Sequence, residues 1–484
     1  MKKVIIIGGG IGGLTSAIRL LNKGYKVTII EKESTLGGKV NKIESKGARF
    51  DLTASIIMTP NIYTEVFKEC NKDYTEYFSI SKLDCIYNIY TYDKKNYKLY
   101  GDINKSIESL ENIKEGLSDE YLEFLYKSNL KYIASERYFL SKPMVQLQEI
   151  LNKNTIQSLL DIKPLKKSSN YISKIISNKD LRQIILFQTL YIGINPYKNS
   201  SIYTLIPAIS QMYGLWYIKG GMYSYIEALE KLIKELGGEI LLNTEVLEIN
   251  GENKEVLTKK GIYKSDIIIN NTDYPYSREK LFKSNEVNKE LSCSVFMLYL
   301  GLNKKYRELE VNNIYINKNQ EKNTNEIFSG HLAKNPDMYI YYPSKMDELI
   351  SGSYASIMNI MIRVPNLKSN NIIWDDQTIK NYRNLIISQI KNIKGLENID
   401  EDIEYESYLT PKYLSERFNS YYGNAFGISH KLTQTTYFRP HMIDKNIKDI
   451  YHIGSSTHPG NGVSVVIDGS KVLVEQILKK DGKK

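Results

Sequence analysis

The sequence predicts an α/β fold that opens with a parallel βαβ unit, and three observations support this prediction. Residues 4–7 form a continuous apolar run, as expected of a strand that is buried on both faces. The apolar residues of 14–21 recur at helical spacing. A second apolar run, residues 26–30, again has the character of a strand, so the chain enters a sheet that is layered with helices.

The turn between the first strand and the helix carries the spacing G-x-G-x-x-G at Gly8, Gly10 and Gly13. The first glycine permits a tight turn, the second lets the backbone approach a pyrophosphate, and the third lets helix and strand pack closely. Ile11 opens the helix, whose free N–H groups and dipole favour phosphate. Glu31 ends the second strand, where a carboxylate accepts hydrogen bonds from ribose hydroxyls. A dinucleotide-binding site of the Rossmann type is therefore predicted.

The rest of the chain continues to alternate strands with helices. The segment 163–179, which is basic and interleaved with apolar residues, is a candidate membrane-docking patch. The pattern of residues 119–152 predicts long amphipathic helices. Their apolar stripe is expected to face the core and not a membrane, and it consists of Leu122, Phe124, Leu125, Leu130 and Ile133. Further helices are expected over 225–236, 378–393 and 463–478, and strands over 86–100, 239–242, 244–249, 266–269, 295–301, 338–342, 357–364 and 450–453.

Composition narrows the range of functions. The 484 residues suffice for two or three domains with sizeable cores. The net charge of +10 is dispersed along the chain, which argues against nucleic acid as a partner. No stretch approaches the roughly 18 to 20 consecutive apolar residues that a membrane span requires. Cys70, Cys85 and Cys293 match no metal-ligand or redox spacing, so we predict free thiols in a reducing cytosol and no metal site.

Four stretches together carry a resemblance to a known family. Residues 4–60 join the glycine turn to Gly-Gly-Lys at 37–39, then to Phe-Asp and Pro60. Residues 187–222 include Phe-Gln-Thr-Leu-Tyr-Ile-Gly-Ile-Asn-Pro-Tyr and Gly-Leu-Trp-Tyr-Ile-Lys-Gly-Gly-Met. Residues 422–440 contain Tyr-Gly-Asn-Ala-Phe-Gly-Ile and Phe-Arg-Pro, and residues 451–463 read Tyr-His-Ile-Gly-Ser-Ser-Thr-His-Pro-Gly-Asn-Gly-Val. The chain thus resembles the flavin-dependent carotenoid desaturases, specifically the bacterial-type phytoene desaturases and their dehydrosqualene (diapophytoene) desaturase relatives.

This resemblance implies an FAD cofactor, with residue roles carried over to matching positions. The N-terminus of the helix predicted over 463–478, which we call the second helix N-terminus, would lie near the flavin. Its dipole would stabilise the anionic reduced form of the flavin there. The matching positions are Gly8, Gly10, Ile11 and Gly13 for the pyrophosphate, Glu31 for the adenosine ribose, Val246 for adenine, Gly38 and Lys39 for the flavin side, and Gly454, Gly462 and Val463 for the second helix N-terminus.

Some positions depart from the family pattern and bear on the substrate and the reaction. Thr53 lies where Gly-Pro is usual, Ile218 and Ser464 replace prolines, and Asp468 replaces a small residue. They shape the pocket more than the pyrophosphate cradle, so FAD binding is not affected. His458, which precedes a proline, is a tempting catalytic histidine, but a turn residue bonded to the backbone is the favoured interpretation. The catalytic residue is left unknown, because hydride removal beside a polyene demands no strong base.

The resemblance also implies how the chain is divided. A Rossmann-like FAD-binding domain of the amine-oxidase type would comprise residues 1–85, 200–275 and 406–484, with an interleaved α+β substrate-binding cap of residues 86–199 and 276–405. The implied activity is FAD-dependent desaturation of an acyclic C30 or C40 isoprenoid, such as dehydrosqualene or phytoene, by hydride transfer to flavin. A single intact fingerprint argues against tightly bound NAD(P).

The implied partners are the lipophilic isoprenoid, quinone or oxygen as electron acceptor, and the inner face of the cell membrane, on which a cytoplasmic protein would dock peripherally. Two alternatives stay open at this point. One is a related flavin oxidoreductase, which is a carotenoid terminal oxidase, a polyene isomerase or saturase, or an amine-oxidase-like enzyme. The other is a non-enzymatic prenyl-binding protein with a fold like that of the Rab GDP-dissociation inhibitors.

Overall fold

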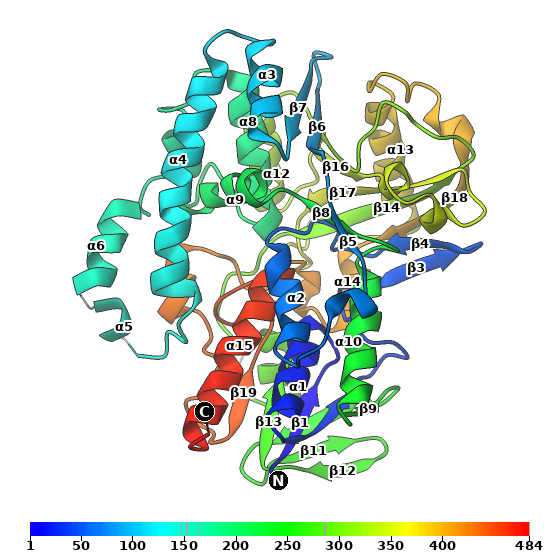
Figure 1. Cartoon of the computed structure of the whole chain (residues 1–484). Helices are drawn as coiled ribbons and strands as arrows, with labels where there is room; N and C mark the ends of the chain where they lie inside the picture. Colours follow the sequence, from blue (N-terminus) through cyan, green and yellow to red (C-terminus); the bar gives the residue numbers. More distant parts are fainter. Residues whose placement is uncertain (147, 152, 163, 285–286, 484) are drawn as a thin grey trace.

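The computed structural model describes residues 1–146, 148–151, 153–162, 164–284 and 287–483. Its chain forms two lobes, each built around its own sheet (Figure 1). We call them the parallel-sheet lobe, which holds the five-stranded sheet, and the mixed-sheet lobe, which holds the seven-stranded sheet. None of the helices among the described residues combines the length and the apolar character that a bilayer crossing demands.

The five-stranded sheet is parallel and has the order β19-β13-β1-β2-β9. Both of its faces are buried, because alternate residues of β1 pack in opposite directions: Val4 and Ile6 face helices, whereas Ile5 and Ile7 face a small antiparallel sheet. The strands are β1 (Lys3–Ile7), β2 (Lys26–Ile30), β9 (Glu239–Leu241), β13 (Ile267–Asn270) and β19 (Ile450–His452). The helices are α1 (Ile11–Asn22), α2 (Pro60–Lys68), α10 (Tyr223–Glu235) and α15 (Val463–Lys480).

The small antiparallel sheet on the other face has the order β10-β11-β12. Its strands are β10 (Val246–Asn250), β11 (Glu255–Thr258) and β12 (Gly261–Lys264). The sequence predicts a strand over 244–249 but does not indicate β11 and β12, because these four-residue strands are too short to establish a period. Strands from four widely separated segments, 3–30, 239–241, 267–270 and 450–452, therefore assemble around one parallel sheet.

The mixed-sheet lobe is built on the order β18-β14-β17-β16-β15-β6-β7, in which only β15 and β6 run parallel. One face of β17 packs on α13, while the other turns toward the parallel-sheet lobe. The strands are β6 (Cys85–Thr91), β7 (Asn96–Tyr100), β14 (Ser294–Leu302), β15 (Asn312–Ile316), β16 (Met338–Tyr341), β17 (Ser356–Val364) and β18 (Ile403–Leu409). The helix α13 spans Asp376–Ile390.

Helices flank this sheet and join the lobes (Figure 1). They are α3 (Ile103–Glu111), α4 (Leu117–Ser135), α5 (Gln148–Leu151), α6 (Lys153–Ile162), α7 (Ser168–Ile172), α8 (Lys179–Thr189), α9 (Leu205–Tyr213), α11 (Tyr274–Tyr276), α12 (Gln320–Phe328) and α14 (Pro411–Phe418). Two further sheets have two strands each. One pairs β3 (Lys42–Ser45) with β4 (Ala48–Asp51), and the other pairs β5 (Ile80–Lys82) with β8 (Trp216–Ile218).

The long helical stretch predicted over 119–152 is interrupted in the structure. Helix α4 passes into a π-helical turn, Glu136–Leu140, and then ends before Pro143, which cannot continue a helix because it lacks an N–H group. The last residue of the predicted stretch, Asn152, lies outside the described residues. The predicted core stripe also divides: Phe124 and Leu125 are buried, whereas Leu122, Leu130 and Ile133 are exposed.

The basic segment 163–179 is also only partly a surface feature. Its residues Ile172, Ile175 and Ile176 are buried in the mixed-sheet lobe, because α7 packs inward. Leu165 is 90% exposed, and Lys166 and Lys167 beside it are exposed. Lys163, the first residue of the segment, lies outside the described residues.

Candidate functional site

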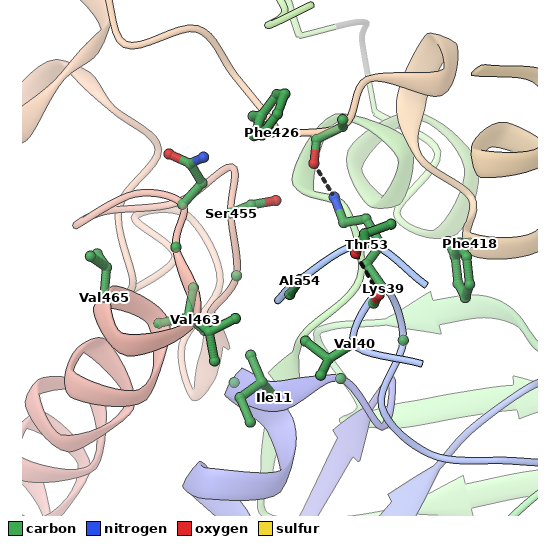
Figure 2. A pocket seen from close by; sticks show the side chains of 18 of the residues that line it. Ile11, Lys39, Val40, Thr53, Ala54, Phe418, Phe426, Ser455, Val463 and Val465 are labelled. Carbon is green, nitrogen blue, oxygen red and sulfur yellow. Dashed lines mark hydrogen bonds between the residues drawn. The ribbon is translucent and has the colours of Figure 1, made fainter. Parts of the chain in front are cut away.

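A cavity of about 490 Å³ extends from the edge of the parallel sheet into the mixed-sheet lobe. Ten of the eleven predicted cofactor residues line it: Gly8, Gly10, Ile11, Glu31, Gly38, Lys39, Val246, Gly454, Gly462 and Val463. These residues lie at the starts of α1, β10 and α15 and in the loops that follow β1, β2 and β19, so the fold brings the separated motifs to one place. Figure 2 shows how Ile11, Val40, Ala54 and Val463 gather around part of this cavity.

The N-terminus of α1 is open toward the cavity. Gly8 has a φ of +95°, a conformation that side chains rarely adopt, and it turns the chain sharply at the end of β1. Gly10 is the N-cap and provides no side-chain hydrogen bond. The first hydrogen bond within the helix runs from the Leu14 N–H to the Gly10 carbonyl, which leaves the first-turn amides available to an acceptor in the cavity.

Gly13 is the one predicted cofactor residue outside the cavity lining. A Cβ at this position would lie 2.4 Å from the Gly8 carbonyl oxygen and 3.1 Å from Ile6 Cγ2. The third glycine of the motif therefore lets α1 pack closely against β1. This packing fixes the position of the glycine turn that precedes α1.

Glu31 is buried and its carboxylate supports the glycine turn. Oε2 accepts a hydrogen bond from the Gly9 N–H at 2.6 Å, and Oε1 accepts one from the Glu33 N–H at 2.9 Å. Burial raises the pKa of this carboxyl above its usual value. A carboxylate has further lone pairs, so Glu31 can still accept hydrogen bonds from a ligand in the cavity.

Lys39 places a buried amine in the cavity next to Gly38. Its Nζ donates to the Ala425 carbonyl at 3.1 Å, and the Thr53 hydroxyl donates to the Lys39 carbonyl at 2.7 Å (Figure 2). Lys39 is half-buried as a residue, and burial lowers the pKa of its amine. A ligand with negative charge or carbonyl oxygens would stabilise it.

Val246 begins β10 at the end of the cavity next to Glu31. The neighbouring Thr244 N–H donates to the Glu31 carbonyl at 2.9 Å, which joins this strand to the end of β2. The Val246 side chain is buried, and the residue lines the cavity together with Thr244 and Glu245. Glu31 and the start of β10 thus lie side by side at this end of the cavity.

A second helix N-terminus faces the same cavity. Helix α15 starts after Gly462, which has a φ of +114°, and its first bond runs from the Val466 N–H to the Gly462 carbonyl. Gly454, two residues after the end of β19, has a φ of +132° and turns the chain toward this helix. Two helix dipoles with glycine N-caps thus direct partial positive charge into one cavity.

Two important residues of the site were not predicted. The Arg439 guanidinium is 1% exposed and donates to the carbonyls of Ile428 (2.9 Å), Ser455 (2.6 Å) and Thr457 (3.1 Å). It thereby fixes the loop that leads to α15. The only signal in the sequence was its place in the Phe-Arg-Pro part of the resemblance.

Asp273 is the other such residue, and it lines the cavity. Its Oδ2 accepts from the Tyr421 N–H at 2.8 Å and from Asn424 Nδ2 at 3.0 Å, and its Oδ1 accepts from the Ser456 hydroxyl at 2.5 Å. Asp273 thus connects three segments that surround the cavity. Nothing local in the sequence marks it, since these three partners of its carboxylate lie more than a hundred residues away.

His458 is a turn residue bonded to the backbone, as the favoured interpretation expected. Its N–H donates to the Pro440 carbonyl, and its Nε2 lies 2.8 Å from the Lys142 carbonyl oxygen. Burial lowers the pKa of the imidazole to about 4. His458 does not line the cavity, although Pro459 does.

The four departures from the family pattern lie in different places. Thr53, Ser464 and Asp468 line the cavity, and burial raises the pKa of the Asp468 carboxyl. Ile218, at the end of β8, is buried in the core of the parallel-sheet lobe and does not line the cavity. Three of the four are thus placed to influence a ligand.

The cradle fits a dinucleotide such as FAD. A Cβ at Gly10 would have only Asn271 Nδ2 within 4 Å, at 3.1 Å, so the cavity beside this glycine is open for a ligand and not filled by protein. The two free helix N-termini supply amides for phosphate and for an electron-rich ring, and Glu31 supplies an acceptor for sugar hydroxyls.

Comparisons with known proteins agree with this fit. The family of flavin containing amine oxidoreductases matches residues 11–273. A 4,4'-diapophytoene desaturase (4,4'-diaponeurosporene-forming) of Staphylococcus haemolyticus is 33% identical and covers 98% of each chain. The enzyme of the same name from Staphylococcus aureus strain Newman is 31% identical and covers 99% of each chain. Among solved structures, cyclohexylamine oxidase from Brevibacterium oxydans shares the fold, with a TM-score of 0.63, 10% identity and 99% of each chain covered.

The fold and the site thus define an FAD-dependent oxidoreductase with a Rossmann-like α/β FAD-binding fold. The chain belongs to the flavin-containing amine oxidoreductase family and, within it, to the carotenoid desaturases that include the 4,4'-diapophytoene desaturases. The prediction of the family and of its FAD cofactor is confirmed. A terminal oxidase, an isomerase or saturase, an amine-oxidase-like enzyme and a non-enzymatic prenyl carrier are not favoured by these relatives.

Proposed function

We propose that this enzyme desaturates an acyclic C30 isoprenoid, 4,4'-diapophytoene, in carotenoid biosynthesis. One observation carries the proposal: the cavity that holds the dinucleotide cradle continues into the mixed-sheet lobe between apolar side chains. These side chains belong to Ile56, Met58, Ile192, Leu205, Ile206 and Ile209. A hydrocarbon has no polar handle, so only such a continuous apolar wall can bind it. The names of the full-length relatives support the C30 substrate.

The chemistry divides between the cofactor and the chain. FAD, when bound, supplies a hydride acceptor. The cavity residues orient the hydrocarbon and exclude water, so that removal of a hydride and a proton from adjacent carbons leaves a conjugated product. No single catalytic side chain is assigned. Quinone or oxygen is the proposed final electron acceptor.

The cofactor residues have proposed roles that follow from their positions. Gly8 and Gly10, with the N-terminus of α1 at Ile11, bind the pyrophosphate, and Gly13 supports them through packing. Glu31 accepts from the adenosine ribose, and the backbone of Val246 contacts adenine. Gly38, Lys39, Gly454, Gly462 and Val463 surround the flavin. The division into an FAD-binding domain (1–85, 200–275, 406–484) and a cap (86–199, 276–405) is part of the same proposal.

Product analysis tests the proposed reaction. The gene is expressed in a host that makes 4,4'-diapophytoene but no other carotenoid, and the extracted pigments are analysed by mass spectrometry. We expect products that have lost two hydrogens for each step and absorb at longer wavelengths. Recovery of unchanged precursor, with FAD-loaded protein present, would refute the proposal. Products that have gained oxygen would show a different reaction in the same cavity.

The insoluble substrate suggests peripheral docking on the inner face of the cell membrane, and helix α4 offers a surface for it. Tyr126, Leu130 and Ile133 are 66%, 50% and 50% exposed on one side of α4. Tyr132 of the same helix lines the cavity. A helix with one edge at the cavity and an exposed apolar stripe would lead substrate directly from the bilayer.

Flotation with liposomes tests this docking surface. The double variant Leu130→Asp and Ile133→Asp should lose most of its liposome binding, since each carboxylate opposes entry into the apolar interface. Ile262→Asp is the matched control, because Ile262 is 60% exposed on β12, at the opposite end of the molecule (Figure 1). Equal flotation of the wild-type protein, the double variant and the control variant would exclude α4 as the docking surface.

A further inference from the structure

Arg363 places a buried positive charge beside the apolar part of the cavity. It lies near the end of β17, lines the cavity and is 3% exposed. Its Nε and Nη1 have no hydrogen-bond partner. Among the ion pairs of the described residues, none includes Arg363. Neither a hydrocarbon substrate nor the surrounding protein accounts for this charge.

Arg363 lies on the cavity side of β17 and pairs across the sheet with Val295 of β14, which also lines the cavity. Asn359, Met361 and Arg363 alternate with residues that pack on α13, so all three face the cavity side of the sheet. Asn359 Nδ2 donates to the Asp51 carbonyl, at the junction with the parallel-sheet lobe. Because a strand rises about 3.3 Å per residue, Arg363 lies roughly 13 Å further along β17.

Two aromatic rings hold the guanidinium in place. Its central carbon lies 5.4 Å from the ring centre of Phe187 and 5.5 Å from that of Tyr191. Such contacts orient a guanidinium, but they do not satisfy its N–H groups. The Asp337 carboxyl interacts with Arg363 electrostatically but forms no ion pair with it. Its Oδ1 instead accepts a hydrogen bond from the Asn317 N–H at 2.7 Å. Arg363 is therefore fixed in position with free donors.

We propose that Arg363 is the binding residue for the anionic end of an apolar carboxylate, so that this cavity accepts a polyene or isoprenoid chain ending in –COO⁻. The inference rests on the proposed function, since it assigns a second ligand class to the same hydrocarbon cavity. A carboxylate suits this residue, because it offsets the buried charge and its oxygens accept hydrogen bonds from a guanidinium that lines the cavity. The apolar walls bind the rest of the chain.

Binding of all-trans-retinoate and of its uncharged methyl ester to the FAD-loaded enzyme tests this proposal. The two probes share the polyene and differ in charge at one end. We expect the wild-type enzyme to bind retinoate about tenfold more tightly than the ester, as measured by the change in the flavin absorption spectrum and by thermal stabilisation. Equal affinity in the wild-type enzyme would overturn the proposal without any variant, even if Arg363→Met failed to fold.

Variants then assign the preference to Arg363. Arg363→Met should abolish the difference between retinoate and ester while retaining FAD, and Arg363→Lys should keep part of it. Met361→Leu, two residues away on the same face of β17, is the matched control and should keep the preference. A preference that persists in Arg363→Met, or loss of FAD from that variant, would overturn the proposal. Because binding is measured without turnover, a failure of desaturation remains a separate result.

Discussion

The two ends of the cavity are built from different materials. The end that we propose for the cofactor is made of backbone: glycines, two helix N-termini and the carbonyls around Lys39 and Arg439. The far end is made of side chains, where apolar residues surround the unpaired Arg363. Positions that depend on backbone geometry, such as the glycines, tolerate few substitutions. Side chains that line an apolar wall can be exchanged for others that fit a different ligand.

Two glycines of the same turn give the strongest test of this contrast. At Gly13 a Cβ would meet the Gly8 carbonyl at 2.4 Å, so Gly13→Ala must displace backbone and should destabilise the fold by more than about 3 kcal/mol. At Gly10 the only close atom is Asn271 Nδ2, so Gly10→Ala should fold but bind FAD at least about tenfold more weakly. Urea unfolding and FAD titration measure the two effects. If both variants changed only FAD affinity, Gly13 would not have the packing role.

Substitution of Arg439 tests whether the end of the cavity that is made of backbone depends on one buried side chain. Arg439→Met leaves several buried carbonyls without donors and should lower the free energy of unfolding by about 3 kcal/mol. Arg383→Met is the control, because Arg383 forms a partly exposed ion pair with Glu406, which contributes at most about 1 kcal/mol. Urea unfolding of both variants at neutral pH measures the difference. A similar small loss in both would show that the loop before α15 holds without Arg439.

His458 sharpens the comparison through pH. Burial lowers the pKa of this imidazole from 6.5 to about 4, so the unfolded chain binds a proton more readily than the folded one. The stability that the neutral imidazole provides is complete above about pH 6.5 and is lost as the pH falls toward 4. From pH 7 to pH 5 this amounts to about 2 kcal/mol. His458→Gln can retain the donor to the Lys142 carbonyl, so its unfolding free energy should fall less over that range. An unchanged pH profile would contradict the burial of a neutral histidine.

The same contrast governs what the sequence could predict. The cradle was predictable because its residues follow one another: the glycine turn, the apolar runs beside it and Glu31 are all local patterns. The break after α4 was missed because helical periodicity outweighed Pro143 in the prediction. Asp273 and Arg363 could not be found, because their importance comes from partners in other segments, such as the rings of Phe187 and Tyr191 around Arg363. Arg439 was marked only by its place in the Phe-Arg-Pro stretch, which does not show which carbonyls it binds.

The central claim is that the flavin and the hydrocarbon share one cavity, and anaerobic mixing tests it most directly. FAD-loaded enzyme is mixed with 4,4'-diapophytoene in detergent micelles without oxygen or quinone, and the flavin band near about 450 nm is followed together with the product mass. We expect the band to bleach while a product with two hydrogens fewer accumulates in equal amount. A band that stays unchanged, in enzyme whose flavin dithionite still reduces, would contradict the account.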